Sequence, residues 1–283
     1  MSTQTSTTTT TTATATTMQQ PQKLQINKPK PKVEVLTLPE YKKAGRTLYE
    51  SFGPEDGVAR YVNRHLEDTD PELKQRCDLL MYEAYTYSHM LHGLVVGVKG
   101  EDTESDSFET VAVWLHPEST DFDNYITLVR SGFARLAWMT GSDGRKRIFN
   151  DLFKVLHDQA EEILSVDKEN KDNVWTLVYL GSTPAARGKG NVRAIFEYMI
   201  KNHVDPDNAL LYLESSAFAN IPIYEKFGLR CVGDIWVGDK ESADGDCARM
   251  DVMIRGPQGS EWKYLKQVRE QRGYVIPDAS KAL

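Results

Sequence analysis

A short glycine-bearing turn, Arg187–Val192 (R-G-K-G-N-V), follows an apolar stretch that begins at Trp175. After the turn, apolar residues recur at helical spacing, so the turn stands at the start of an amphipathic helix. The first N–H groups of a helix have no partner within it and lie at the positive end of its dipole. Glycines let an anion approach that backbone closely. These residues predict the binding of a phosphate or pyrophosphate, with added charge from Arg187, Lys189 or Arg193.

Two common nucleotide-binding patterns do not fit this turn. In the Walker pattern G-x4-G-K-[ST], the lysine is followed by Ser or Thr, but Lys189 is followed by Gly190, and position 183 is threonine. The dinucleotide pattern G-x-G-x-x-G fails at its third glycine, because Arg193 stands there. ATP, GTP and NAD are therefore poor ligands for this turn.

A second segment, Leu211–Leu229 (L-Y-L-E-S-S-A-F-A-N-I-P-I-Y-E-K-F-G-L), follows further along the chain. Its second half resembles motif B of the GNAT superfamily of N-acetyltransferases, N-x-P-x-Y-E-K-x-G-F. The glycine turn is similar to motif A of that superfamily, R/Q-x-x-G-x-G/A, and departs from it only at Val192, where a small residue is usual. The order of the two motifs is that of the superfamily.

The resemblance implies an α/β (α+β) fold with a mixed, mostly antiparallel sheet, a splayed parallel strand pair and flanking helices. It also implies acetyl-CoA as the co-substrate. Its pantetheine arm would pair with the strand end 180–182, which would open away from Leu211–Glu214. The residues implied to bind it are Leu180, Gly181, Ser182, Arg187, Gly188, Lys189, Gly190, Asn191, Val192 and Asn220.

Tyr224 stands where the superfamily carries the general acid that protonates the departing thiolate. The structural alternative is a packed tyrosine, because Ile221, Tyr224 and Phe227 share one side of a helix. Asn220 has two readings as well. Asparagine is a favoured helix N-cap, and the family position would bring it to the CoA arm. For Asn220 the two roles are compatible.

The general base is less clearly marked, because the strand 174–182 contains no carboxylate. Glu214, on the following strand, is the candidate base, and a purely structural hydrogen-bond acceptor is the alternative. His116, after the strand 110–115, is a further candidate, and water could also relay the proton. No metal site is expected, since His89 and His92 are not joined by carboxylates or cysteines at ligand spacing.

Within the superfamily, the stretch Val111–Val237 resembles the pattern of puromycin N-acetyltransferases. Val111–Ser119 (V-A-V-W-L-H-P-E-S) is similar to the strand and Pro-Glu-Ser segment of that pattern. A Thr-rich N-terminal stretch and an extra helical region before His92 depart from it. Puromycin is therefore not the expected physiological substrate.

The elements that position these residues follow from hydrophobic periodicity and from turn residues. Helices are predicted at 41–52, 57–65, 70–91, 121–164 with a break at 141–144, 190–201, 221–227 and 261–272. Strands are predicted at 32–38, 92–98, 110–115, 174–182, 209–214, 229–237 and 247–255. Strands that alternate with helices predict a single N-acetyltransferase domain, 33–283, enlarged by two helical insertions.

Composition sets the protein class. With 40% hydrophobic and 27% charged residues, the chain is typical of globular proteins. The net charge of −7 disfavours a nucleic-acid partner, and no apolar run is long enough for a membrane span. Three scattered cysteines favour a reducing compartment, cytoplasm or nucleus. Residues 1–32, rich in Thr, Ser, Pro and Lys, are expected to form a disordered tail without a secretory signal.

The sequence thus predicts an acetyl-CoA-dependent N-acetyltransferase that transfers acetyl directly to an amine. The helical region 121–164 would cover the acceptor site, which favours a small-molecule amine over an open peptide groove. Two alternatives stay open, a protein or peptide acceptor and a non-catalytic acyl-CoA-binding module. Val192 and the missing strand carboxylate favour the module, whereas Tyr224 favours the enzyme.

Overall fold

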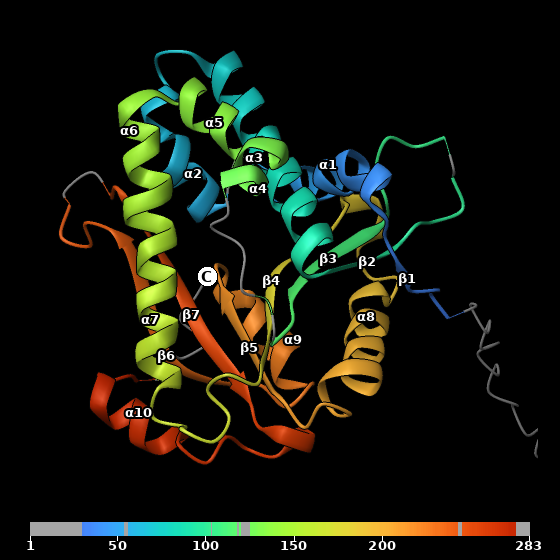
Figure 1. Ribbon diagram of the computed structural model, residues 1–283, viewed down its shortest axis with the longest axis vertical. Helices are drawn as coiled ribbons and strands as arrows, with labels where there is room; N and C mark the ends of the chain where they lie inside the picture. Colours follow the sequence, from blue (N-terminus) through green and yellow to red (C-terminus); the bar gives the residue numbers. More distant parts are fainter. Residues whose placement is uncertain are drawn as a thin grey trace, which may run out of the picture.

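One mixed sheet runs through the molecule (Figure 1). The computed structural model describes residues 30–53, 56–102, 104–117, 119, 125–242 and 245–275. Its strands are β1 (Glu34–Val35), β2 (Leu94–Val98), β3 (Thr110–Leu115), β4 (Val174–Ser182), β5 (Leu210–Ser215), β6 (Arg230–Gly238) and β7 (Cys247–Arg255), in the spatial order β1-β2-β3-β4-β5-β7-β6. Neighbours pair antiparallel except β4 and β5, which pair parallel. The predicted mixed, mostly antiparallel sheet with one parallel pair is confirmed.

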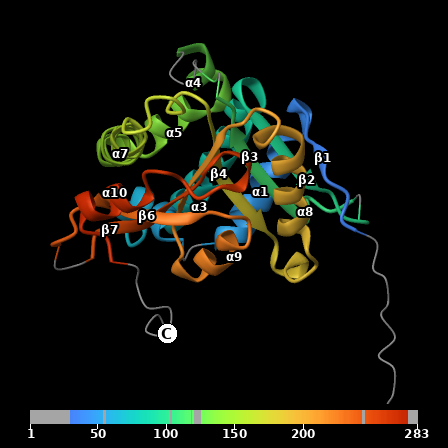
Figure 2. The ribbon, with the colours of Figure 1, turned by 90° about the horizontal axis from the view of Figure 1, so that it is seen from below.

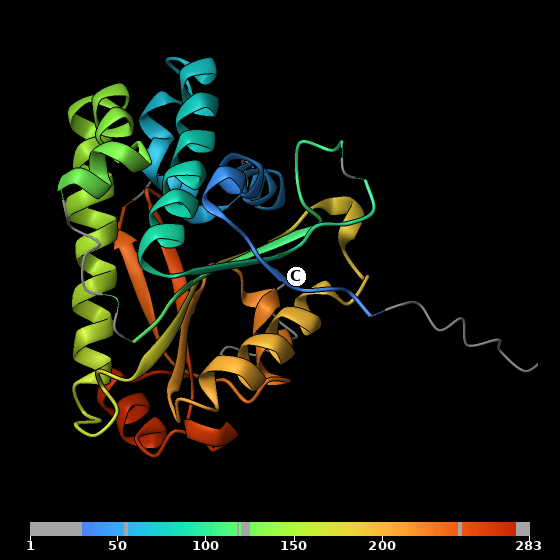
Figure 3. The same ribbon diagram turned by 45° about the vertical axis from the view of Figure 1, so that its right-hand side comes forward.

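Helices flank this sheet. They are α1 (Tyr41–Phe52), α2 (Gly57–Asn63), α3 (Pro71–His92), α4 (Tyr125–Ser131), α5 (Phe133–Met139), α6 (Gly141–Arg145), α7 (Lys154–Leu164), α8 (Asn191–Met199), α9 (Ile221–Glu225) and α10 (Leu265–Arg272). A π-helical segment, Lys146–Phe153, joins α6 to α7. Figure 3 shows the three as one long rod beside β6 and β7.

The two faces of the sheet carry different helices. On one face, α8 and α9 bury Phe196 and Tyr224 against Trp114, Trp175 and neighbouring apolar residues. Trp114 and Phe196 are fully buried, and each such side chain stabilises the fold by roughly 1.5–3 kcal/mol. The opposite face is covered by α1, α2, α3, α5, α7 and α10. Figure 2 shows α7 and α9 on opposite sides of β6 and β7.

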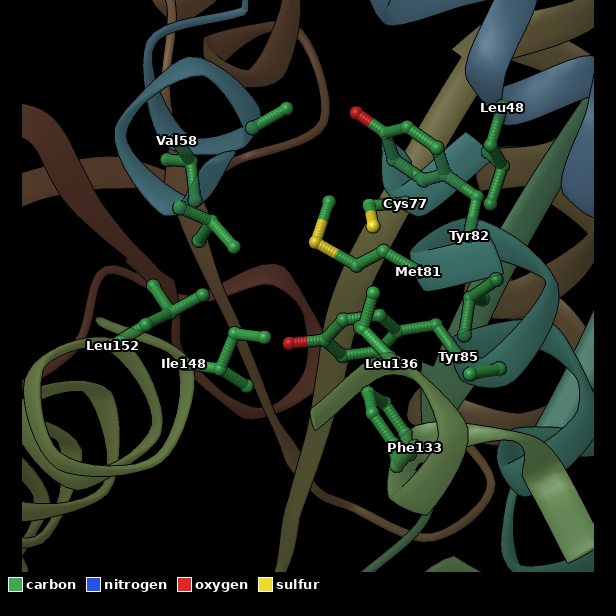
Figure 4. Packing of buried hydrophobic residues seen from close by; sticks show 14 of the residues in the cluster. Leu48, Val58, Cys77, Met81, Tyr82, Tyr85, Phe133, Leu136, Ile148 and Leu152 are labelled. Atoms are coloured by element: carbon green, nitrogen blue, oxygen red, sulfur yellow. The ribbon is translucent and has the colours of Figure 1, made fainter. Parts of the chain in front are cut away.

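The π-helical segment and α3 meet over the second face. Figure 4 shows Ile148 and Leu152 pointing toward Val58 of α2 and toward the hydroxyl end of Tyr85 of α3. All four side chains are buried. Three parts of the chain that are distant in sequence are therefore held together beside the end of β4.

Helix caps explain where α2 and α3 begin. Asp70 accepts a hydrogen bond from the Leu73 N–H at 2.9 Å, and Pro71 occupies the first helical position. Asp56 caps α2 in the same way and accepts from the Ala59 N–H at 2.9 Å. Because Asn serves as an N-cap about as well as Asp does, the cap depends on the side-chain oxygen more than on its charge.

The structure corrects several predicted bounds. The first strand is only Glu34–Val35, because this short stretch alone pairs with β2. The predicted helix break at 141–144 is half right, since Gly141 has φ +67° but the helix continues through Gly144. Gly144 packs so closely on Thr140 that a Cβ there would lie 2.1 Å from the Thr140 Cβ. The break that the periodicity missed is at Gly132, with φ +100°.

Most of the predicted tail, residues 1–29, lies outside the described residues. Within the described ranges, none of the helices combines the length and apolarity that crossing a membrane requires. The same ranges contain no group of three or more His, Cys, Asp or Glu side chains that could hold a metal ion. The three cysteines are free thiols.

Candidate active site

The parallel strands β4 and β5 pair only along the first half of β4. Their pairing runs from Val174 opposite Leu210 to Leu177 opposite Leu213 and ends there. Strand β5 continues beside β7, with Glu214 opposite Val252, while β4 extends to Ser182. No described strand pairs with the edge of residues 178–182 that faces the opening. Residues 180–182 have no partner on β5, as predicted, but Leu211–Leu213 pair with residues 175–177 of β4. On β5, therefore, only Glu214 of the predicted stretch lies beyond the pairing.

A bulge accompanies this splay. Opposite β3 the register jumps from Leu177 to Tyr179, which leaves Val178 as the extra residue. In consequence Val178 and Tyr179 both pack toward the α1 and α3 side, and Leu177 and Leu180 pack toward α8. Bulges beside active sites redirect side chains in this way. The bulge turns Leu180 toward the opening.

The glycine turn lies beyond the end of β4. Gly188 has φ +78° and Gly190 has φ +88°, a region that only glycine enters without strain, and α8 begins at Asn191 directly afterwards. The turn thus presents the N-terminal N–H groups of α8, as expected of an anion site.

The polar side chains of the turn differ in their contacts. Lys189 forms an ion pair with Glu109 at 2.6 Å, and the buried Asn191 side chain donates to Glu109 at 2.8 Å and to the Thr110 hydroxyl at 3.1 Å. The Lys189 ammonium lowers the pKa of Glu109. Arg187 is exposed and donates to the Ser51 carbonyl at 3.1 Å. Lys189 and Asn191 hold the turn to β3, which leaves Arg187 as the cation at the opening.

A cleft of about 820 Å³ lies against this turn. Nine of the ten residues predicted to bind the co-substrate line it, and the tenth, Lys189, does not. Val192 is among the lining residues despite its departure from the motif. Arg193 is outside the lining, whereas Lys226 of the second motif is part of it. At Gly181, a Cβ would lie 2.7 Å from the Ser51 Cβ, so this glycine lets α1 approach the strand.

A smaller chamber of about 90 Å³ adjoins the cleft. The two cavities share the lining residues Phe52, Asp56, Leu180, Ser216, Asn220 and Tyr224. The chamber takes Leu177 and Leu213 from the α8 face of the sheet and Val178 and Tyr179 from the opposite face. It therefore crosses the sheet at the splay, with the cleft opening on one side.

Tyr224 lies where cleft and chamber meet. It is buried with 8% of its surface exposed, and its ring packs 5.8 Å from that of Phe196. Burial raises the pKa of Tyr224 to about 12, so the hydroxyl keeps its proton at neutral pH. Asn220 lies beside it at the start of α9, but its side chain makes no capping hydrogen bond. The predicted N-cap hydrogen bond of Asn220 is wrong, and its side chain lines both cavities instead.

Glu214 and His116, the two candidate bases, lie in different places. Glu214 is half-buried and lines the chamber, and burial raises its pKa to about 7. A carboxyl group with that pKa can accept a proton near neutral pH. His116 lines neither cavity, and its ring lies 6.0 Å from that of Trp175. The geometry favours Glu214.

Sequence reasoning missed Asp56, a second carboxylate of the chamber. Asp56 accepts hydrogen bonds from the Ala59 N–H and from the Ser216 hydroxyl, both at 2.9 Å. Burial raises its pKa. It stands directly before the predicted helix 57–65, but nothing local showed that Ser216, 160 residues away, would be its neighbour.

Comparisons with known proteins agree with this architecture. The chain is 32% identical over 219 residues to an uncharacterized N-acetyltransferase of Schizosaccharomyces pombe. The matched region covers 77% of this chain and 81% of the relative. No protein-family model matches.

Two solved structures that share the fold are acetyltransferases. Drosophila melanogaster polyamine N-acetyltransferase matches with TM-score 0.50 and 12% identity, over 80% of this chain and 100% of that one. An agmatine N-acetyltransferase matches with TM-score 0.51 and 13% identity, over 79% and 98%. With the splay, the turn and Tyr224 in place, the chain belongs to the GNAT superfamily of N-acetyltransferases.

Proposed function

We propose that this N-acetyltransferase uses acetyl-CoA and transfers its acetyl group directly to a compact small-molecule amine. One observation carries the proposal. The parallel pairing ends at Leu177 and Leu213, and beyond it the cleft at the glycine turn meets a chamber that contains Tyr224 and Glu214.

The residues of the cleft fit acetyl-CoA. The free edge of β4 offers backbone groups to an extended amide-bearing arm, as a neighbouring strand would. The glycine turn offers N–H donors to phosphates, with Arg187 and Lys226 close by. Acetyl-CoA supplies an activated acyl group as a thioester when it is bound. A backbone N–H at the splay could donate to the thioester carbonyl and stabilise developing negative charge there.

Glu214 and Tyr224 transfer the protons of the reaction. Glu214 accepts the proton that the bound ammonium must lose before its nitrogen can attack the acyl carbon. Tyr224 donates its hydroxyl proton to the sulfur as the carbon–sulfur bond breaks, and its phenolate then takes the second proton, which the nitrogen loses as it becomes a neutral amide. Glu214 passes its own proton to water, so both side chains return to their starting state and one proton is released overall.

The size of the chamber supports a compact acceptor. Its volume is about 90 Å³, and Leu152 and Leu156, from the π-helical segment and α7, line it but not the cleft. A folded protein chain or an extended peptide needs an open groove, which is larger than this chamber. A small primary amine needs no such groove.

The test is an assay of thiol release. The full-length protein is incubated with acetyl-CoA and a panel of primary amines, free thiol is followed by absorbance, and products are identified by mass spectrometry. At least one small amine should release thiol in step with N-acetyl product. Tyr224→Phe should lower kcat by about 100- to 10,000-fold, because the leaving thiolate loses its proton donor.

The matched control is Tyr198→Phe on α8, which packs on the same core but lines neither cavity and should leave kcat unchanged. Acetyl-CoA binding without thiol release from any amine would support the non-catalytic binding module instead. Release only with peptide or protein acceptors would move the substrate class away from small amines.

A further inference from the structure

The chamber wall carries an unbalanced charge. Its lining residues, all within the described ranges, include two carboxylates, Asp56 and Glu214, and contain no Lys, Arg or His. The adjoining cleft, by contrast, has Arg187 and Lys226 in its wall. A carboxylate held in a small, partly apolar cavity is costly to keep ionised unless a cation joins it. The charge of the chamber therefore favours a cationic guest.

Asp56 is held in place for such a role. The Ala59 N–H and the Ser216 hydroxyl donate to its two oxygens, each at 2.9 Å, and tie α2 to the chain after β5. These donors stabilise the ionised form and fix its direction, but neither carries a charge. Among the residues that the structure describes, the chamber wall has no Lys, Arg or His that could neutralise the Asp56 carboxylate.

A second observation concerns Tyr82, which lines neither cavity but packs directly behind their shared wall residue Phe52. Tyr82 is 1% exposed, and among the described residues its hydroxyl has no hydrogen-bond partner. Its ring stacks on Phe52, which lines both cavities, at a centroid distance of 5.7 Å. Figure 4 shows its hydroxyl end pointing away from α1 toward the side of the cluster where Val58, a chamber residue, lies. Buried hydroxyl groups nearly always have a partner.

Aromatic side chains form much of the remaining wall. Phe52, Tyr85 and Tyr179 line the chamber, and the rings of Tyr85 and Tyr179 lie 4.9 Å apart. Aromatic faces attract cations and also accept the hydrocarbon body of an amine. Within the described residues, this wall offers no cation that would compensate a carboxylate on the guest.

We infer that Asp56 is a specificity-determining residue that binds the ammonium form of the acceptor, and that the chamber excludes amines carrying a carboxylate. The substrate class is then a compact primary amine without a carboxylate, not an amino acid. This inference rests on the proposed function. Asp56 binds the ammonium group, and Glu214 removes its proton before the nitrogen attacks. An amino acid would bring its own carboxylate toward two others, and that repulsion selects against it.

The first test compares acceptors that differ in one group. Two series are used, phenethylamine, phenylalaninol and phenylalanine, and isoamylamine, leucinol and leucine. In at least one series the amine should exceed the amino acid by about 100-fold or more in kcat/KM, as expected for an uncompensated buried charge. The amino alcohol, similar in size to the amino acid but without its carboxylate, should stay within about 10-fold of the amine. An amino acid that equals its amine, or an amino alcohol as poor as the amino acid, overturns the inference.

The second test removes the charge of Asp56. Asp56→Asn keeps a good N-cap for α2, so the fold should be retained. It should raise KM for the amine by about 10- to 100-fold, change KM for acetyl-CoA much less, and reduce the preference for amine over amino acid. The matched control is Asp70→Asn, which caps α3 in the same way but lies outside the chamber. Its kinetics should equal those of the parent.

Ser216→Ala gives a variant that does not depend on the cap. It leaves the carboxylate in place and removes one of its donors, so KM for the amine should rise by about 3- to 10-fold. An unchanged amine KM in both Asp56→Asn and Ser216→Ala, in a protein that acetylates amines, overturns the inference and leaves the proposed function intact. Absence of acetylation with every amine contradicts the proposed function itself.

Discussion

The cleft and the chamber share six lining residues but are built differently. Nine of the nineteen cleft residues come from one stretch, the end of β4 and the turn up to Val192, and the charged cleft residues are Arg187, Lys226 and the shared Asp56. The chamber wall is gathered from α1, α2, α3, the π-helical segment, α7, α9, β4, β5 and β7, and its charged groups are Asp56 and Glu214. The cleft is thus the more local region and has a cationic excess, whereas the chamber is assembled from distant segments and is anionic.

The difference in charge gives the site a direction. Anionic phosphates are favoured on the side of the cleft and cationic amines on the side of the chamber, so each partner is attracted to its own end. The splay of β4 and β5 is the passage between them. If this comparison holds, substitutions in each region should change the kinetics of one substrate and leave the other largely unaffected.

The largest effect in the comparison is expected at Glu214. Glu214→Gln should lower kcat/KM for the amine by about 100-fold or more, because the amine loses its proton acceptor. In the parent, kcat/KM should fall as the pH drops below about 7, where Glu214 becomes protonated. The titratable groups near it, Tyr212 and Tyr85, keep their protons in this range because burial raises their pKa values. Rate profiles from pH 5.5 to 9 check both points, and a variant that keeps the parent profile contradicts them.

Stability separates this loss from misfolding. The folded-state pKa of Glu214, about 7, lies above its ordinary value of 4.5. The folded state therefore favours the protonated form, and this contribution is full below pH 4.5 and lost as the pH rises through about 7. Glu214→Gln, which cannot ionise, should be more stable than the parent at pH 8, by on the order of 1–3 kcal/mol, and should lose that advantage at pH 4.5. Thermal unfolding at the two pH values measures this.

A medium effect is expected from enlarging the chamber. Leu156→Ala removes three carbon atoms from the chamber wall at a half-buried position of α7. Larger amines should gain about 10-fold in kcat/KM relative to the smallest accepted amine, the usual scale for a change of this size in an apolar pocket. KM for acetyl-CoA should stay the same. Leu164→Ala is the matched control, since it lies on the same helix, is also half-buried and lines neither cavity. Equal shifts in both variants would contradict the chamber as the acceptor site.

The sequence predicted the fold well where a pattern is local. The bounds of α1, β3, β4 and β7 were predicted to the residue, because apolar periodicity and turn residues define them within a few positions. The π-helical segment was missed, because its residues follow ordinary helical periodicity and only tertiary packing widens the turn. The break at Gly132 was missed because the flanking residues continue the helical pattern.

The candidate site shows the same contrast between residues in local motifs and residues that long-range contacts bring together. The resemblance to two motifs was sufficient to propose ten of the nineteen residues that line the cleft, because these ten stand within or beside the motifs. It did not propose the cleft residues that are distant in sequence from both motifs, Ser51, Phe52, Asp56 and Gly57. The ion pair between Lys189 and Glu109 was beyond sequence reasoning, since the two residues are 80 positions apart. Asp56 joins Ser216 across 160 positions, and its sequence context did not single it out. The acceptor side thus depends on contacts that no short motif encodes.

The smallest effect is expected on the cationic side of the comparison. Arg187 is exposed, and exposed ion pairs are weak, so Arg187→Ala should raise KM for acetyl-CoA by only about 2- to 5-fold. KM for the amine should not change, because Arg187 does not line the chamber. Added salt screens the same attraction, so parent and variant should converge at about 1 M salt. Arg193 lies on α8, directly after the turn that carries Arg187, but outside the cleft. Arg193→Ala should therefore match the parent at every salt concentration. If the two arginine variants behaved alike, net charge and not the position of Arg187 would attract the co-substrate, and the local character of the cleft would have to be abandoned.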